Sequence, residues 1–184
     1  QEMSAEFGEQ FAKAEGTAFV SGNGVGKPEG FLTNSSIGTV NSGAGAALTA
    51  DGLISLYHEP KAEYAQNGTF VFSRSTLAAI RKLKTDSNDY VFQPGNQLSG
   101  GMVATILGAP YVQATDMPAV GAGNKPIAFG DFRRGYMIVD RVNLAILRDP
   151  FTQATSGNVR YVARKRIGGQ VILPEAIKTQ TVSA

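Results

Sequence analysis

The sequence contains one histidine and no cysteine, so the side chains that most often perform nucleophilic or metal chemistry are scarce. The lack of cysteine excludes disulfides, thiolate zinc sites, iron–sulfur clusters and cysteine nucleophiles. A Ser-His-Asp triad would have to use His58, and no G-x-S-x-G motif supplies its serine. A second zinc ligand four residues later is also missing, because that position is Ala62. We expect His58 to be a half-exposed surface residue, and a small enzyme that uses His58 and a carboxylate stays open as an alternative.

The glycine-rich segment at residues 22–30 invites a phosphate-binding interpretation, which its spacing does not support. A Walker A motif that ends at Gly26-Lys27 would place Ser21 at its first glycine and Pro28 at its magnesium-binding hydroxyl. Each register of G-x-G-x-x-G places a charged residue at the third glycine. We therefore predict a shaped turn and no cofactor.

Carboxylates also fail to form a convincing acid/base or metal site. Three aspartates near expected strand ends each have an arginine close by in sequence: Asp131 with Arg133, Asp140 with Arg141, and Asp149 with Arg148. Ion pairing or turn capping explains this pattern better than acid/base catalysis. Asp86 and Asp89 lack the remaining ligands and the glycine of a calcium loop. We predict no catalytic, cofactor-binding or metal-binding residue.

Length and composition favour one compact domain, or a domain and a half. The chain has 184 residues, 42% of them hydrophobic and 17% charged, which is enough for a core without a disulfide or metal. No run of 18 apolar residues and no signal-peptide pattern occurs, so we expect a soluble protein with no membrane partner. Because the sequence starts at Gln1, we expect a processed chain or a fragment.

Charge is distributed unevenly along the chain. Residues 1–92 hold seven Lys/Arg and ten Asp/Glu, whereas residues 93–184 hold ten and five. Seven of the ten later bases are arginine, which favours pairing across protein interfaces. A nucleic-acid reader would have a denser basic face with interleaved aromatic residues. Partner proteins are therefore the favoured interpretation, with a solvated surface as the alternative for any single arginine.

Helices and glycine-rich loops dominate the first half of the chain. Apolar residues at intervals of three and four predict an amphipathic helix over residues 3–18, with its end frayed at Gly16. Residues 34–50 are typical of an irregular or edge-strand segment. A second helix is expected to start with Thr49 or Asp51 as its N-cap.

Strands replace helices toward the end of the chain. A buried strand at residues 69–72 is expected to precede a helix capped by Ser73 or Ser75. Later strands are expected at residues 103–114 (with a break), 127–129, 136–139, 142–147, 159–163 and 171–177. Helices followed by strands indicate an α+β protein and not alternating βαβ units.

Five groups of residues resemble, in order, the sequence blocks of HK97-like phage major capsid proteins. They lie at residues 18–32, 70–92, 106–118, 127–141 and 157–176. The first is similar to the family's loop "aFl-G-G-g-P-G-il", and the fourth, with Gly130-Asp131-Phe132 and Gly135-Tyr136, is similar to "i-fGDf…gY-i-dR". Each motif is weak alone, but five in register cover essentially the whole chain.

The resemblance implies an HK97-like capsid fold of the α+β class, with helices mainly in the first half and antiparallel or mixed strands in the second. It implies four segments: residues 1–18 as the end of a long peripheral-domain helix, 19–140 as the axial domain, 141–166 as peripheral-domain strands, and 167–184 as a C-terminal strand returning to the axial domain. The family's N-terminal arm, extended loop and most of the long helix would lie upstream of Gln1.

The implied function is structural and not enzymatic. The subunit would assemble into pentamers and hexamers of an icosahedral phage or prophage head that encloses double-stranded DNA. Expected partners are copies of itself, packaged DNA bound non-specifically, and scaffold, protease and portal proteins. The expected location is the virion, after synthesis in the bacterial cytoplasm. A shell protein of a gene-transfer particle or of an encapsulin-type compartment is the alternative.

Candidate interface residues come from two loops and from the arginines, because a ring needs one surface of a subunit to meet a different surface of the next. The loop at residues 93–101 and the link at 118–126 are expected to project toward the symmetry axis. Strand alternation places three arginines on one face. That face is expected to meet carboxylates of a neighbour, packaged DNA, or only solvent. The candidates are Arg160, Arg164, Arg166, Arg133, Arg134, Gln93, Asn96 and Gln97.

Overall fold

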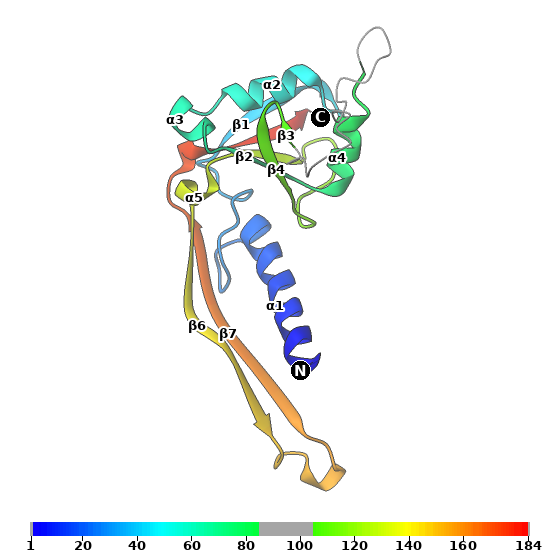
Figure 1. The fold of residues 1–184 in the computed structure, drawn as a ribbon, viewed down its shortest axis with the longest axis vertical. Helices are drawn as coiled ribbons and strands as arrows, with labels where there is room; N and C mark the ends of the chain where they lie inside the picture. The colour runs from blue at the N-terminus through cyan, green and yellow to red at the C-terminus, as the bar shows by residue number, and fades with distance from the viewer. Residues whose placement is uncertain (1, 85–104, 184) are drawn as a thin grey trace, which may run out of the picture.

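The computed structural model describes residues 2–84 and 105–183 and consists of a body built on a mixed sheet and a long projecting arm (Figure 1). The six strands of the body follow the order β1-β8-β5-β2-β4-β3. They are β1 (Gly38–Gly45), β2 (Thr69–Phe72), β3 (Thr105–Ile106), β4 (Ala109–Gln113), β5 (Ile127–Gly130) and β8 (Ile177–Ser183). The β1–β8 and β2–β4 pairs are parallel and the other three are antiparallel. The mixed sheet and the helices confirm the expected α+β class.

Short helices pack on the body. They are α2 (Ala50–His58), α3 (Ala62–Ala65) and α4 (Arg74–Arg81), with a single turn α5 (Phe132–Gly135) where the body meets the arm, and α2 and α4 have side-chain N-caps. The Thr49 hydroxyl accepts a hydrogen bond from the amide of Gly52 at 3.0 Å, and Ser73 accepts one from Thr76 at 3.4 Å. These bonds satisfy amides that the first helical turn leaves free. The N-caps are therefore Thr49 and not Asp51 for α2, and Ser73 and not Ser75 for α4.

The sheet buries side chains on both of its faces. Phe70, Phe129 and Leu56 are fully buried in the cluster beneath α2 and α4, where the Phe70 and Phe129 rings lie 4.4 Å apart. Ala128 and Ile177 point to the opposite face and join a second cluster with residues of the first helix and the loop after it. Because both faces of β5 are covered, this strand is buried along its whole length. It is the centre of the body.

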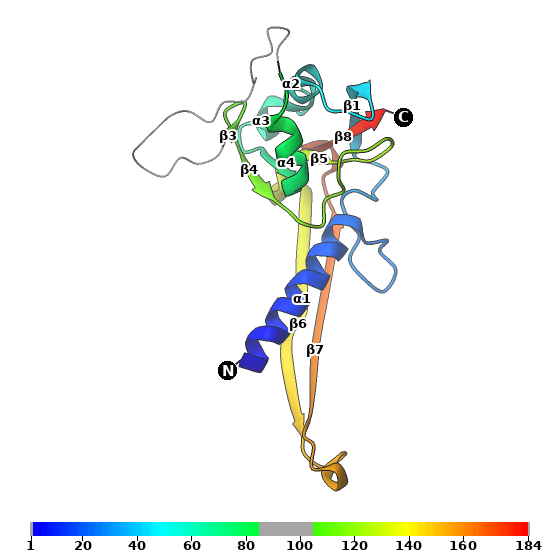
Figure 2. The same ribbon diagram turned by 90° about the vertical axis from the view of Figure 1, so that its right-hand side faces the viewer.

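The arm is an antiparallel hairpin with a helix beside it. Strands β6 (Tyr136–Asp149) and β7 (Arg160–Val171) pair from Tyr136↔Val171 to Asp149↔Arg160. Helix α1 (Glu2–Ser21) runs beside this hairpin, with its C-terminal end at the body (Figure 2). Both irregularities of register lie in β6, so side chains alternate without interruption along β7. Two 3₁₀ turns, η1 (Ala154–Ser156) and η2 (Pro174–Ala176), complete the elements of the described residues.

The first helix is longer than the sequence predicts. It passes Gly16 and ends at Ser21, because Thr17, Phe19 and Val20 make contacts with distant residues that the local pattern does not show. The Thr17 hydroxyl donates a 2.6 Å hydrogen bond to Asp116. A Cβ at Gly16 would lie 2.9 Å from that carboxylate, so the glycine allows the close approach.

The strand boundaries of the arm also differ from the prediction. The segments expected at 136–139 and 142–147 form one strand, and the strand expected at 159–163 continues to Val171. Cross-strand pairing carries β7 through Gly168 and Gly169, which have little strand propensity of their own. The strand expected at 171–177 is wrong: η2 lies there, and β8 begins at Ile177. Among the residues described, no helix is long and apolar enough to cross a membrane.

Candidate subunit interface

One face of the hairpin is held against α1. Lys165 Nζ lies 2.6 Å from the Glu15 carboxylate, and the hydrogen bond that Lys165 donates to this carboxylate raises the pKa of Lys165. The Phe19 and Tyr136 rings meet edge to face at 5.9 Å. A Cβ at Gly169 would lie 3.1 Å from the Phe19 ring and 2.6 Å from the Tyr136 hydroxyl, so only glycine fits there. The face of β7 that carries its odd-numbered residues is therefore the inner face.

The glycine-rich loop braces the base of the arm. Its Glu29 amide donates to the Gly169 carbonyl at 2.8 Å, and the Tyr136 hydroxyl donates to the Glu29 carbonyl at 2.7 Å. Burial, with a smaller contribution from the charge of Glu29, raises the pKa of Tyr136 to about 12. Gly24 and Gly26 adopt φ of 74° and 67° within the turn. The loop is thus the shaped turn that its spacing predicts.

The outer face of the hairpin carries the predicted arginines. Arg160, Arg164 and Arg166 share a face of β7 and are exposed. In the described part of the chain, neither Arg164 nor Arg166 lies within 4 Å of a carboxylate. Arg160 is opposite Asp149 in the register. The structure thus brings the three arginines together on one face of β7, with Arg166 also at the edge of the groove beside α1.

Apolar side chains lie between these arginines. The strand register places four residues of β6 on the same outer face, and each is at least 40% exposed: Met137, Val139, Val142 and Leu147. At the tip, Phe151 is 85% exposed. Exposed apolar surface of this extent marks interaction sites in soluble proteins. Sequence reasoning found the arginines but missed this apolar set, because a buried strand shows the same residue types.

Two of the aspartates cap turns, as the sequence predicts. Asp149 accepts hydrogen bonds from the amides of Phe151 and Thr152 and from the Thr152 hydroxyl, and these bonds lower its pKa. Asp131 is buried and accepts from the amides of Arg133 and Arg134 at 3.1 and 3.2 Å. Both carboxylates are thus engaged in fixing backbone turns.

The remaining interface candidates lie apart from the arm's outer face. Arg133 and Arg134 are exposed on α5, with Arg134 Nε 3.8 Å from Asp131. In the link at 118–126, Asn124 accepts a 3.0 Å hydrogen bond from Val182, which ties the link to β8. The expected loop residues Gln93, Asn96 and Gln97 lie outside the described residues.

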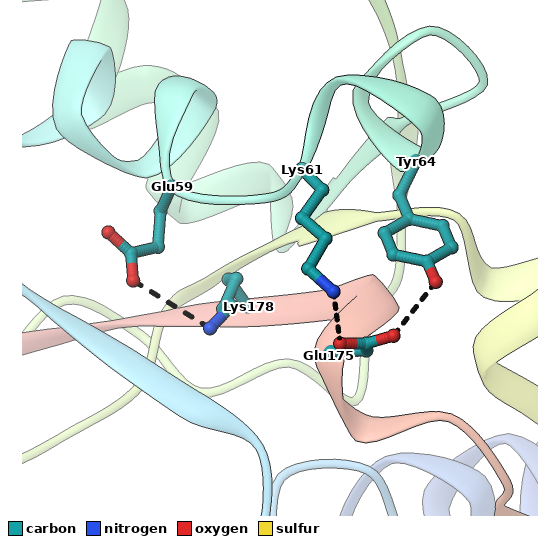
Figure 3. A network of polar contacts seen from close by, with 5 residues as sticks. All are labelled: Glu59, Lys61, Tyr64, Glu175 and Lys178. Atoms are coloured by element: carbon teal, nitrogen blue, oxygen red, sulfur yellow. Dashed lines mark hydrogen bonds and ion pairs between the residues drawn. The ribbon is translucent and has the colours of Figure 1, made fainter.

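A polar network that the sequence does not reveal ties the helices of the body to the last strand (Figure 3). Glu175 accepts hydrogen bonds from Lys61 at 2.8 Å and from Tyr64 at 2.9 Å, and both lower its pKa. Lys178 lies 3.7 Å from Glu59. Each of these contacts joins residues more than 100 positions apart, so no local signal predicts it.

The residues that could perform chemistry are exposed and do not cluster in the described part of the chain. His58 is exposed at the end of α2, with its ring 5.1 Å from that of Tyr57. In the ranges that the structure describes, no three His, Asp or Glu residues are grouped to hold a metal ion. A groove of about 790 Å³ between α1, the glycine-rich loop and the arm is lined by Phe11, Ala18, Pro28 and Ile167, with Glu15 and Lys165 already paired. The arrangement therefore suits protein contacts better than catalysis.

Comparisons with known proteins agree with this assessment. A model of the phage capsid family matches residues 1–182. The capsid of a native GTA particle is 36% identical, with a TM-score of 0.88 over 99% of this chain and 71% of that chain. The capsid of an empty GTA particle is also 36% identical, with a TM-score of 0.87 over 99% of this chain and 65% of that one.

A more distant likeness extends to a compartment shell. The holo-SrpI encapsulin complex from Synechococcus elongatus PCC 7942 is 17% identical, with a TM-score of 0.66 over 98% of this chain and 64% of that chain, and shares the fold. No curated protein matches the sequence. The chain spans about two thirds of the length of these solved structures.

Proposed function

Because the chain belongs to the phage capsid family, we propose that it is a shell subunit that assembles with copies of itself into pentamers and hexamers of an icosahedral head. The head would enclose double-stranded DNA, held without sequence preference. The two similar capsids of GTA particles support the shell role, since each aligns with 99% of this chain.

The arm is the observation that carries this proposal. A two-stranded hairpin in water is at best marginally stable unless another element covers one of its faces. Here α1 contacts the inner face through Lys165 and Gly169 but leaves Ile138 and Ile146 on that face exposed, and the outer face exposes four apolar side chains between arginines. Copies of the same chain would cover that face and the tip at Phe151 in a closed shell.

We assign the segments that the sequence suggests to the domains of such a shell subunit. Residues 1–18 and 141–166 would form a peripheral domain between capsomers, and residues 19–140 with 167–184 an axial domain around the symmetry axes. The paired strands extend beyond residues 141–166, from Tyr136 to Val171, so the arm reaches further than that segment. Scaffold, protease and portal proteins are further proposed partners, with synthesis in the bacterial cytoplasm and a final location in the virion.

A gene-transfer particle is the second candidate, favoured by the 36% identity to the two GTA capsids. An encapsulin-type compartment rests on the fold alone. The cargo separates these classes, because a DNA-filled particle protects nucleic acid from nuclease and a compartment retains an enzyme.

Electron microscopy of the full-length product of the reading frame tests the proposal. Isometric shells with five- and six-fold capsomers are the expected result. Monomers that persist at high protein concentration and in crowding agents would contradict it.

A further inference from the structure

The arm and α1 carry opposite net charges. The arm, residues 136–171, holds six Lys/Arg and two Asp/Glu, whereas α1 holds four Glu and one Lys. The contact between them uses Glu15 and Lys165. The rest of each charge set remains available for other partners.

The acidic surface of α1 lies on the side away from the hairpin. Phe11, Glu15 and Ala18 line the groove toward the arm, whose wall includes Lys165 and Arg166. At 3.6 residues per turn, Glu6 and Glu9 lie about 140–160° around the helix from Phe11. Both are exposed, and neither is within 4 Å of a basic group in the ranges described. The helix therefore presents carboxylates to the outside of the molecule.

The arginine surface lies on the other side of the same slab. Arg164 and Arg166 alternate along β7 with Lys165, which pairs with Glu15 of α1, so they belong to the other face of the strand, and Arg166 also lines the edge of the groove beside α1. In the described ranges, these two arginines and the carboxylates of Glu6 and Glu9 form no ion pair within one subunit. Opposite charges without a partner in their own subunit can pair between copies, in a head-to-tail contact that closes into a ring when the rotation allows it.

We propose that the outer face of the β6–β7 hairpin binds the acidic outer face of α1 in a neighbouring copy, with Arg164 and Arg166 opposite Glu6 and Glu9. This inference rests on the proposed shell function and identifies two of the surfaces that meet. Packaged DNA is the competing partner for the arginines. The exposed apolar residues among them, including Val139 and Leu147, favour a protein, because a phosphate backbone does not cover apolar surface.

The contact is small, so it would hold copies together only within an assembled shell. Helix α1 is about 30 Å long and about 10 Å wide, so the strip buries on the order of 300 Å² on each copy. A stable pairwise interface buries about 800 Å² on each partner. The strip alone is too small for a stable dimer, and it gains strength when many copies are held together.

A charge-swap experiment in the full-length protein tests the proposal. The double variant Arg164→Glu/Arg166→Glu and the double variant Glu6→Arg/Glu9→Arg should each lower the yield of sedimenting particles at least tenfold. The quadruple variant should recover yield to within about threefold of wild type, because the opposite charges face each other again. Arg148→Glu is the matched control, because its cross-strand partner Tyr161 places it on the inner face of the same hairpin.

The outcomes separate this inference from the proposed function. A quadruple variant no better than either double variant would overturn the inference, as would double variants that assemble like wild type. Normal particles with reduced nucleic acid in the arginine variant would overturn it in favour of DNA. Wild-type protein that forms no particle at all would refute the shell function and this contact with it. Circular dichroism and the neutral Arg164→Gln/Arg166→Gln variant, expected to lose yield without charge repulsion, exclude misfolding as the cause.

Discussion

Replacing Phe129 or Phe151 by alanine makes the same chemical change at a core site and at an arm site. Phe129 is fully buried, with its ring 4.4 Å from that of Phe70 and 5.2 Å from that of Tyr57. Gly68 lies so close that a Cβ there would be 2.4 Å from the Phe129 ring. Phe151, by contrast, is 85% exposed at the tip of the arm.

The magnitude follows from how far each site can relax. Truncation of a buried phenylalanine costs about 3–5 kcal/mol. Strand β5 is fixed on both sides by β2 and β8, so the cavity left by Phe129→Ala cannot collapse, and we expect about 4–5 kcal/mol. At about 2–4 °C per kcal/mol for a chain of this size, the Tm should fall by roughly 8–20 °C. Phe151→Ala should change the free energy of unfolding by less than about 0.5 kcal/mol.

Thermal unfolding followed by circular dichroism measures the stability of both variants, and sedimentation measures their assembly. Phe129→Ala should lower the Tm strongly, whereas Phe151→Ala should keep the wild-type Tm and lose particle yield. Phe129→Leu is the control, since it retains most of the buried volume and should lose less than half as much stability. Equal Tm values for the two alanine variants would refute the assignment of core and interface.

Three further predictions concern the body. Gly130→Ala should strongly destabilise the fold or prevent folding, because Gly130 has φ of 152° and the alanine Cβ would lie 2.1 Å from the Ala176 carbonyl oxygen. The Tm and the yield of soluble protein measure this effect, and a wild-type Tm would contradict it. Ser73→Ala should cost about 1 kcal/mol in denaturant unfolding through loss of the α4 cap, with Ser73→Asn as a variant that restores capping. Hydrogen bonds from lysine and tyrosine lower the pKa of Glu175 from 4.5, so the stability it contributes is present above pH 4.5 and lost as the pH falls through the lowered pKa. Glu175→Gln should flatten that acid-side loss in a Tm-against-pH profile, whereas Glu63→Gln should leave it unchanged.

Local sequence signals predicted the elements whose stability is local. The β-branched and aromatic run at residues 69–72 is β2, and the hydroxyl residues before the next apolar stripes cap α2 and α4. The alternation along β7 correctly placed Arg160, Arg164 and Arg166 on one face. These features depend on residues within one or two turns of each other.

Features set by distant contacts could not be predicted in the same way. Strand β7 passes through Gly168 and Gly169 because β6 supplies the pairing and Phe19 packs closely against the second glycine. The hydrogen bonds of Glu175 to Lys61 and Tyr64 join segments that have no shared motif. The apolar residues on the outer face of the arm are of the same types as those of a buried strand. Only the structure shows that no other element of the described chain covers them.

Amide hydrogen exchange in assembled shells and in dissociated subunits tests most directly whether the arm is completed by neighbouring copies. We predict that residues 136–171 exchange at least tenfold more slowly in shells, with the largest change near Phe151, while the centre of the body at β5 exchanges equally slowly in both states. Equal exchange of the arm in the two states would contradict the account.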